Sequence, residues 1–175
     1  MSARSIVLIG FMGAGKSSVG RCLQKRTGLA CFDTDEMVSS KLGLSISEIF
    51  AQHGEEHFRD RESDALQELR GAKPAVVVTG GGIVLRKENV DLLRELGTVI
   101  WLHANEEILF ERASPRGNRP LLQSDRPRET FAELLRKRVP LYEKAADLQL
   151  DTSTLTHDQV ADVILEKIET PATSR

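Results

Sequence analysis

The chain has 175 residues, roughly one domain at about 150 residues per domain, and its 40% hydrophobic and 29% charged residues exclude a disordered or collagen-like chain. A net charge of −2 disfavours general nucleic-acid binding, and no apolar run approaches the roughly 20 residues that cross a membrane. We therefore expect a monomeric, cytoplasmic protein that binds neither nucleic acid nor membrane, with one domain over residues 1–175 and no disulfide framework.

Short β-branched runs alternate with helical stretches along the chain, a pattern typical of a parallel α/β sheet. Strands are predicted at 6–9, 30–32, 75–79, 99–102 and 148–150. Helices are predicted at about 17–27, 45–70 with an interruption near Gly54, 87–95, 105–112 and up to about 144, with a last helix starting near Thr156. The predicted fold class is therefore α/β, with a five-stranded parallel sheet flanked by helices.

Two further segments lack helix or strand patterns. Residues 113–126 are rich in Ser, Pro, Gly, Asn and Arg, and loops of that length in compact domains are usually functional or disordered. We predict a mobile lid here, because a loop that closes over phosphates and brings in an arginine would stabilise transition-state charge. Residues 170–175 are predicted to be a frayed tail.

Residues 10–17, Gly-Phe-Met-Gly-Ala-Gly-Lys-Ser, fit the phosphate-loop pattern G-x-x-x-x-G-K-[ST] at every fixed position. The motif lies between a predicted buried strand and a helix, as its chemistry requires, so a glycine-rich turn that binds nothing is the weaker alternative. Backbone N–H groups of such a loop surround phosphate oxygens at the helix N-terminus. Lys16 would reach the β- and γ-phosphates, and the Ser17 hydroxyl would bind Mg²⁺.

Two aspartates follow the second predicted strand. Many phosphate-loop proteins hold the metal with an Asp after another strand, but the strand at 75–79 ends in Thr79 and glycines. Asp33 and Asp35 can supply the missing carboxylate, and residues two apart on an extended segment point the same way. One could serve the metal and the other an acceptor hydroxyl, and turn or capping chemistry is the alternative. The absence of an Asn-Lys-x-Asp string weighs against a GTPase.

Gly80, Gly81 and Gly82 follow a buried strand, at the sheet edge where open α/β sheets bind ligands. Their backbone N–H groups could bind an acceptor, although a plain tight turn is a common use of glycine. Arg59 and Arg138 lie on predicted helices, where spacing alone favours a solvated surface.

With these motifs taken together, the chain resembles the shikimate kinases over nearly its whole length. The strings that carry the resemblance are 10–17, Phe32-Asp33-Thr34-Asp35, Phe58-Arg59-x-x-Glu62, Gly80-Gly81-Gly82, Arg119-Pro120-Leu121-Leu122 and Arg138-x-Pro140-x-Tyr142. Six strings in family order are far more specific than the phosphate loop alone.

The resemblance implies ATP contacts from Gly13, Ala14, Gly15, Lys16, Ser17, Ser18, Arg112 and Arg119. It implies that Asp33 joins Ser17 in serving Mg²⁺ and that Asp35 engages the substrate hydroxyls. The shikimate carboxylate and ring would be held by Arg59, Arg138 and the backbone of 80–82, with Glu62 orienting Arg59. Arg119 would act on the transferring phosphate, and Arg112 would stack near adenine. The sequence departs from the family at Ser18, where Thr is frequent, and at 151–155, which lacks the basic or proline residue often beside adenine.

The expected activity is transfer of the ATP γ-phosphoryl group to shikimate, with Lys16, Asp35 and Arg119 as the catalytic residues. From the residues alone, the expectation is a Mg-dependent kinase of a small anionic acceptor, and the resemblance names the acceptor. Two alternatives are a kinase of another acceptor, such as gluconate or a nucleoside monophosphate, and a nucleotide-binding module without transfer.

Overall fold

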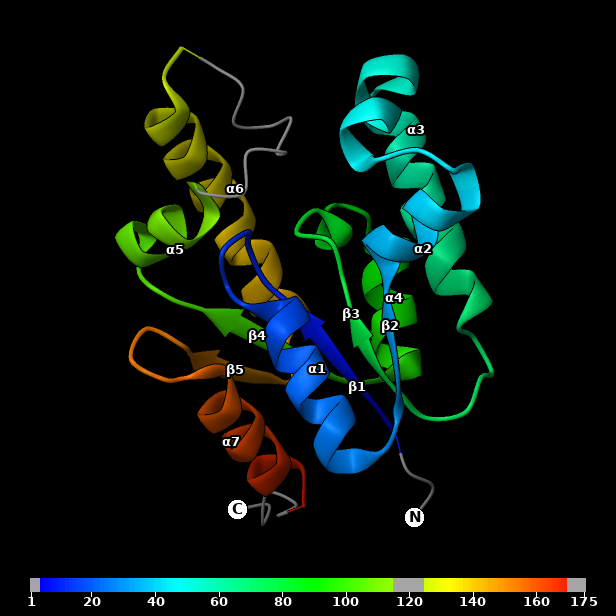
Figure 1. Ribbon diagram of the computed structural model, residues 1–175, viewed down its shortest axis with the longest axis vertical. Coiled ribbons are helices and arrows are strands. Elements are labelled where there is room, and N and C mark those ends of the chain that lie inside the picture. The colour runs from blue at the N-terminus through cyan, green and yellow to red at the C-terminus, as the bar shows by residue number, and fades with distance from the viewer. Residues whose placement is uncertain (1–3, 115–124, 170–175) are drawn as a thin grey trace.

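The computed structural model describes residues 4–114 and 125–169, and its centre is a five-stranded parallel sheet in the order β2-β3-β1-β4-β5 (Figure 1). The strands are β1 (Ser5–Ile9), β2 (Ala30–Asp33), β3 (Ala75–Val78), β4 (Gly97–His103) and β5 (Leu148–Asp151). This confirms the predicted fold class and the place of every predicted strand. Part of the predicted lid, residues 115–124 with Arg119, lies outside the described residues, as does the predicted tail at 170–175.

The continuous apolar runs form the middle of the sheet, because a parallel strand there is covered on both faces. Val7, Leu8 and Ile9 of β1 have no exposed surface. In the register, Leu8 pairs with Val78 of β3 on one side and with Ile100 of β4 on the other. The carboxyl ends of these strands therefore meet at one edge of the sheet, where the phosphate loop follows β1.

Helices cover both faces of the sheet. They are α1 (Lys16–Thr27), α2 (Thr34–Leu42), α3 (Ile46–Glu68), α4 (Lys87–Leu96), α5 (Glu106–Ala113), α6 (Pro127–Ala145) and α7 (His157–Glu169), with a 3₁₀ turn η1 (Ile83–Leu85). Figure 1 shows α1 and α7 on one face and α4 and α6 on the other. No helix within residues 4–114 and 125–169 is long and apolar enough to cross a membrane.

Helices α2 and α3 form a pair that extends beyond the carboxyl ends of the strands (Figure 1). Val38 on α2 packs with Ile49, Phe58 and Ala65 on α3 in an apolar core separate from that of the sheet. The predicted interruption is confirmed: Gly54 has φ 81° and ψ 170°, which kinks α3. The α2–α3 pair thus has an apolar cluster of its own, while Leu66 of α3 joins the core of the sheet.

The structure corrects the expected extended segment from Asp33 to Asp35. Asp33 ends β2 and is the N-cap of α2, and its Oδ1 accepts a hydrogen bond from the Asp35 N–H at 3.0 Å. Because that bond satisfies an unpaired N–H of the first helical turn, the chain enters a helix directly after the strand. The direction of the Asp35 side chain is therefore set by helix α2 and not by the alternation of side chains along a β-strand.

Candidate active site

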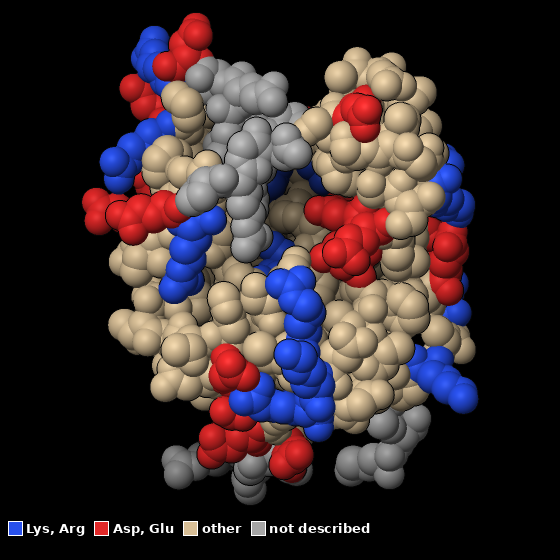
Figure 2. Space-filling view, in the orientation of Figure 1, with Lys and Arg blue, Asp and Glu red and all other residues tan. Residues whose placement is uncertain are grey.

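A cavity of about 330 Å³ opens at the carboxyl edge of the sheet. Figure 2 shows it as a hollow in this face, with basic side chains visible in its depth and acidic side chains on one rim. It is lined by Met12, Gly13 and Gly15–Ser18 of the phosphate loop, by Asp33 and Asp35, by Ile46, Phe50, Phe58, Arg59 and Glu62 of α3, and by Thr79–Gly82 and Arg138. One continuous space thus joins the phosphate loop to a charged region beneath α3.

The phosphate loop has the backbone geometry of an anion-binding turn. Gly13 and Gly15 have φ of 83° and 87°, in the left-handed region that favours glycine. Gly15 is the N-cap of α1 and no side chain caps that helix, so the positive end of its dipole faces the loop, where an anion is favoured. The Lys16 ammonium group donates to the carbonyls of Gly10 and Phe11 at 2.7 and 3.1 Å, which holds it over the loop.

Ser17 and Asp33 lie together at the end of this loop. The Ser17 hydroxyl donates to Asp33 Oδ2 at 3.1 Å, although the two residues come from different elements. A hydroxyl and a carboxylate are hard oxygen ligands, and Mg²⁺ is usually held by one or two such groups with substrate phosphates and water. No cluster of three or more His, Cys, Asp or Glu in the described part of the chain could hold a metal by itself. The residues present therefore fit a Mg²⁺ ion that needs the nucleotide to complete its coordination.

Asp35 presents a carboxylate without a partner. The residue is half-buried, but its Oδ1 is shielded from solvent and has no hydrogen-bond partner among the described residues. Burial, together with the negative charges of Glu62 and Asp33, raises the pKa of Asp35 to about 7. A carboxylate in this state can accept a hydrogen bond or a proton from a hydroxyl placed in the cavity.

Arg59 is a buried cation fixed by two carboxylates of its own helix. Its guanidinium forms an ion pair with Glu62, which has no exposed surface, and a second one at 2.9 Å with Glu55, which is 48% exposed. Burial raises the pKa of Glu62 even though Arg59 and Arg138 act against that shift. The interpretation of Arg59 as solvated surface, favoured by spacing alone, is therefore wrong.

Arg138 supplies the second cation of this region. It is 4% exposed and, within the described residues, no carboxylate lies within ion-pair distance of it. The Gly81 and Gly82 N–H groups donate to no other described residue, and Gly81 lies beside Arg138 while Gly82 lies beside Arg59. This part of the cavity therefore offers a cation without an ion-pair partner among the described residues and two open N–H donors, which suit a carboxylate.

The structure brings most of the predicted site residues to this one cavity. Ala14 does not line it, because its side chain is buried and its N–H donates to the Phe11 carbonyl at 3.2 Å. Arg112 does not line it either, and its guanidinium donates to the Thr152 hydroxyl and carbonyl at 3.2 and 3.1 Å. Arg112 is thus next to 151–155, the segment at which the sequence departs from the family.

Several residues that line this cavity or hold its residues in place were not identified from the sequence. Glu55 is the exposed partner of Arg59, and the i,i+4 spacing of the two residues on one predicted helix could have indicated this ion pair. Thr34 accepts a hydrogen bond from the Gly80 N–H at 3.2 Å, and no local pattern connects residues 46 apart. Phe50, which tilts against Phe58 with ring centroids 4.9 Å apart, lines the cavity without any distinguishing motif.

Fold and site together define a phosphate-loop α/β protein with an adjoining pocket for a small acceptor, and comparison with known proteins agrees. The sequence model of the family described as shikimate kinase matches residues 12–169. Shikimate kinases of Thermodesulfovibrio yellowstonii and Moorella thermoacetica are 46% and 47% identical over 166 and 165 residues, covering 95% and 94% of each pair of chains. A solved shikimate kinase from Acinetobacter baumannii, in complex with shikimate, is 35% identical with a TM-score of 0.93, covering 98% of this chain and 96% of that one. The chain belongs to the shikimate kinase family.

Proposed function

We propose that the protein transfers the γ-phosphoryl group of ATP to the 3-hydroxyl of shikimate, giving ADP and shikimate 3-phosphate in aromatic amino-acid biosynthesis. The observation that carries this is one cavity that joins the phosphate loop to Asp35, Arg59 and Arg138, in a chain of the shikimate kinase family. Its volume of about 330 Å³ falls within the range of small-molecule sites. We also propose that the enzyme works as a cytoplasmic monomer, the expectation drawn from its sequence.

The nucleotide side of the proposal rests on residues 13–18. Their backbone N–H groups and Lys16 would bind the phosphates, and Arg112 would lie near adenine. Ser17 and Asp33 would hold Mg²⁺, which would neutralise the charge that develops on the transferring phosphate. Arg119 keeps its predicted role at the transferring phosphate, and it lies outside the described residues.

The acceptor side of the proposal divides the substrate into a carboxylate and hydroxyls. Arg138, with its uncompensated charge, would bind the carboxylate together with the Gly81 and Gly82 N–H groups, and Arg59 would add hydrogen bonds. Asp35 would orient the reacting hydroxyl and accept its proton. We assign the acceptor carboxylate to Arg138 before Arg59 because the charge of Arg59 is already neutralised by two carboxylates.

The experiment is a coupled assay of ADP release with shikimate, quinate, gluconate and nucleoside monophosphates, each with and without Mg²⁺. The proposal expects turnover with shikimate at least tenfold above the others and dependence on the metal. Faster turnover with gluconate or a nucleotide would show that this compound, and not shikimate, is the acceptor. Binding of ATP with no product from any acceptor would support a nucleotide-binding module.

A further inference from the structure

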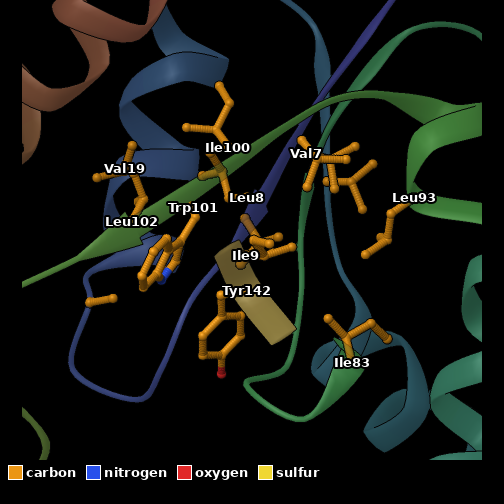
Figure 3. Close-up of a cluster of buried hydrophobic side chains, with 14 of the residues drawn as sticks. Val7, Leu8, Ile9, Val19, Ile83, Leu93, Ile100, Trp101, Leu102 and Tyr142 are labelled. Carbon is orange, nitrogen blue, oxygen red and sulfur yellow. The ribbon is translucent and has the colours of Figure 1, made fainter. Parts of the chain in front are cut away.

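Tyr142, on α6 one turn after Arg138, is buried and does not line the cavity. Its ring stacks on Trp101 with centroids 5.9 Å apart and an interplanar angle of 23°. Figure 3 shows its hydroxyl oxygen directed away from the indole ring. Because a buried tyrosine hydroxyl usually requires hydrogen-bond partners, the contacts of this oxygen indicate what the residue does.

The hydroxyl connects two segments of the acceptor region. It donates a hydrogen bond to the carbonyl oxygen of Gly81, 61 residues away in sequence. The Arg138 guanidinium lies at the same place, since its Nη1 and the Tyr142 hydroxyl are each 3.6 Å from the position that a Cβ on Gly81 would take. A phenol has one proton and lone pairs that accept, so while it donates to Gly81 it can also accept from a neighbouring guanidinium. Burial raises the pKa of Tyr142, which keeps the donated proton in place.

The bond to Gly81 also determines where the next N–H group points. In a planar trans peptide, the carbonyl and the following N–H point to opposite sides. With the Gly81 carbonyl held against Tyr142, the Gly82 N–H is turned away from Tyr142, and Gly82 lines the cavity. Glycine on both sides of this peptide offers little steric resistance to a flip, so the hydroxyl is the group that restrains it.

We infer that Tyr142 is a positioning residue for the acceptor carboxylate: its single hydroxyl holds the Arg138 guanidinium and the Gly81–Gly82 peptide in the orientations that bind that group. The inference rests on the proposed function, because it assumes a carboxylated acceptor in this part of the cavity. It assigns Tyr142 no contact with ATP and none with the reacting atoms.

The first test is steady-state kinetics of Tyr142→Phe, which removes the hydroxyl and keeps the ring. KM for shikimate should rise roughly tenfold, the size of one hydrogen bond to a charged group, with kcat within about twofold and KM for ATP unchanged. The matched control is Trp101→Phe, which loosens the packing around the Tyr142 ring and leaves the hydroxyl. It should lower the unfolding temperature without changing KM for shikimate.

An unchanged KM for shikimate in Tyr142→Phe, or an equal rise in both KM values, would overturn the inference. A wild-type enzyme that does not phosphorylate shikimate would instead overturn the proposed function, so the two failures are distinct.

A second measurement does not depend on the folding of any variant. Tyr142 is the one tyrosine in the sequence, so growth on 3-fluorotyrosine labels this position alone. Saturating shikimate should shift the ¹⁹F resonance, and a non-hydrolysable ATP analogue should leave it nearly unchanged. A resonance that does not shift when shikimate binds, in a labelled enzyme that still phosphorylates shikimate, would contradict the inference.

Discussion

The two glycine-rich segments of the cavity use glycine for different reasons. In the phosphate loop, Gly13 and Gly15 adopt left-handed backbone angles that other residues rarely reach, and a Cβ on Gly13 would also lie 2.3 Å from the Leu109 carbonyl oxygen. In the triplet, none of the three glycines has a positive φ, but a Cβ on Gly82 would lie 2.3 Å from the Arg59 guanidinium. The phosphate loop therefore needs glycine for its backbone conformation as well as for space, and Gly82 needs it for space alone. The space at Gly82 is limited by a functional side chain that arrives from α3.

The same contrast holds for charge. The phosphate-binding part of the nucleotide side relies mainly on backbone N–H groups and one lysine within a single short motif. The acceptor side relies on buried side chains from α2, α3 and α6, and each of them depends on its neighbours. The acceptor side should therefore lose function through changes that leave the phosphate loop intact.

The largest expected effect comes from Asp35→Asn, which should reduce transfer by about 10²–10⁴-fold while ATP binding stays near wild type, because a positioned base is lost. Asp33→Asn is the matched control on the metal side, and excess Mg²⁺ or Mn²⁺ should partly rescue it. Initial rates against metal concentration at saturating ATP and shikimate separate the two. Rescue of Asp35→Asn alone would reverse the assignment.

The next effect is on stability and concerns the two carboxylates that flank Arg59. Glu62→Ala leaves a buried guanidinium without its buried partner and should cost about 3–5 kcal/mol of unfolding free energy. Glu55→Ala removes a half-exposed pair and should cost less than about 1 kcal/mol. Urea denaturation of both variants measures the difference. Equal losses would show that burial does not decide the strength of these pairs.

A smaller effect distinguishes positions within the triplet. Gly82→Ala should displace the Arg59 guanidinium and weaken shikimate binding by about 1–3 kcal/mol, the usual cost of an overpacked site. Gly81→Ala should be tolerated better, since its Cβ would meet other atoms only at 3.5 Å and beyond. Calorimetric titration with shikimate compares them, with ATP as the reference ligand. If Gly81→Ala lost as much shikimate affinity as Gly82→Ala, the lack of room for a Cβ would not explain why glycine is needed at position 82.

The last effect is the pH dependence of stability. Because the pKa of Asp35 is raised to about 7, the folded protein binds a proton between about pH 4 and pH 7 that the unfolded chain releases. The contribution of Asp35 to the unfolding free energy is therefore present at low pH and is lost as pH rises toward 7. Between pH 5 and pH 8, the unfolding free energy of Asp35→Asn should decline by about 2–3 kcal/mol less than that of wild type. Denaturation in metal-free buffer tests this, and identical pH profiles would contradict it.

Local features of this protein were predictable and long-range ones were not. The buried strands, the phosphate loop and the interruption of α3 at Gly54 are each encoded within a few residues of sequence, and the structure contains all of them. The contact of Arg59 with Gly82 requires α3 to pack over the end of β3, which no short pattern encodes. Asp33 takes up the capping role that the sequence offered as an alternative, and its other carboxylate oxygen also accepts from Ser17, so capping and a place beside the phosphate loop are compatible.

The separate apolar core of the α2–α3 pair has a consequence for how such enzymes can diverge. Val38, Ile49, Phe58 and Ala65 pack among themselves, whereas Leu66 at the C-terminal end of α3 is buried in the core of the sheet. Replacement of α2 and the part of α3 that precedes Leu66 would change the acceptor walls contributed by α3 and leave the strands and the phosphate loop unaltered. This segment is therefore the natural one to graft when a new acceptor is sought for the same phosphate donor.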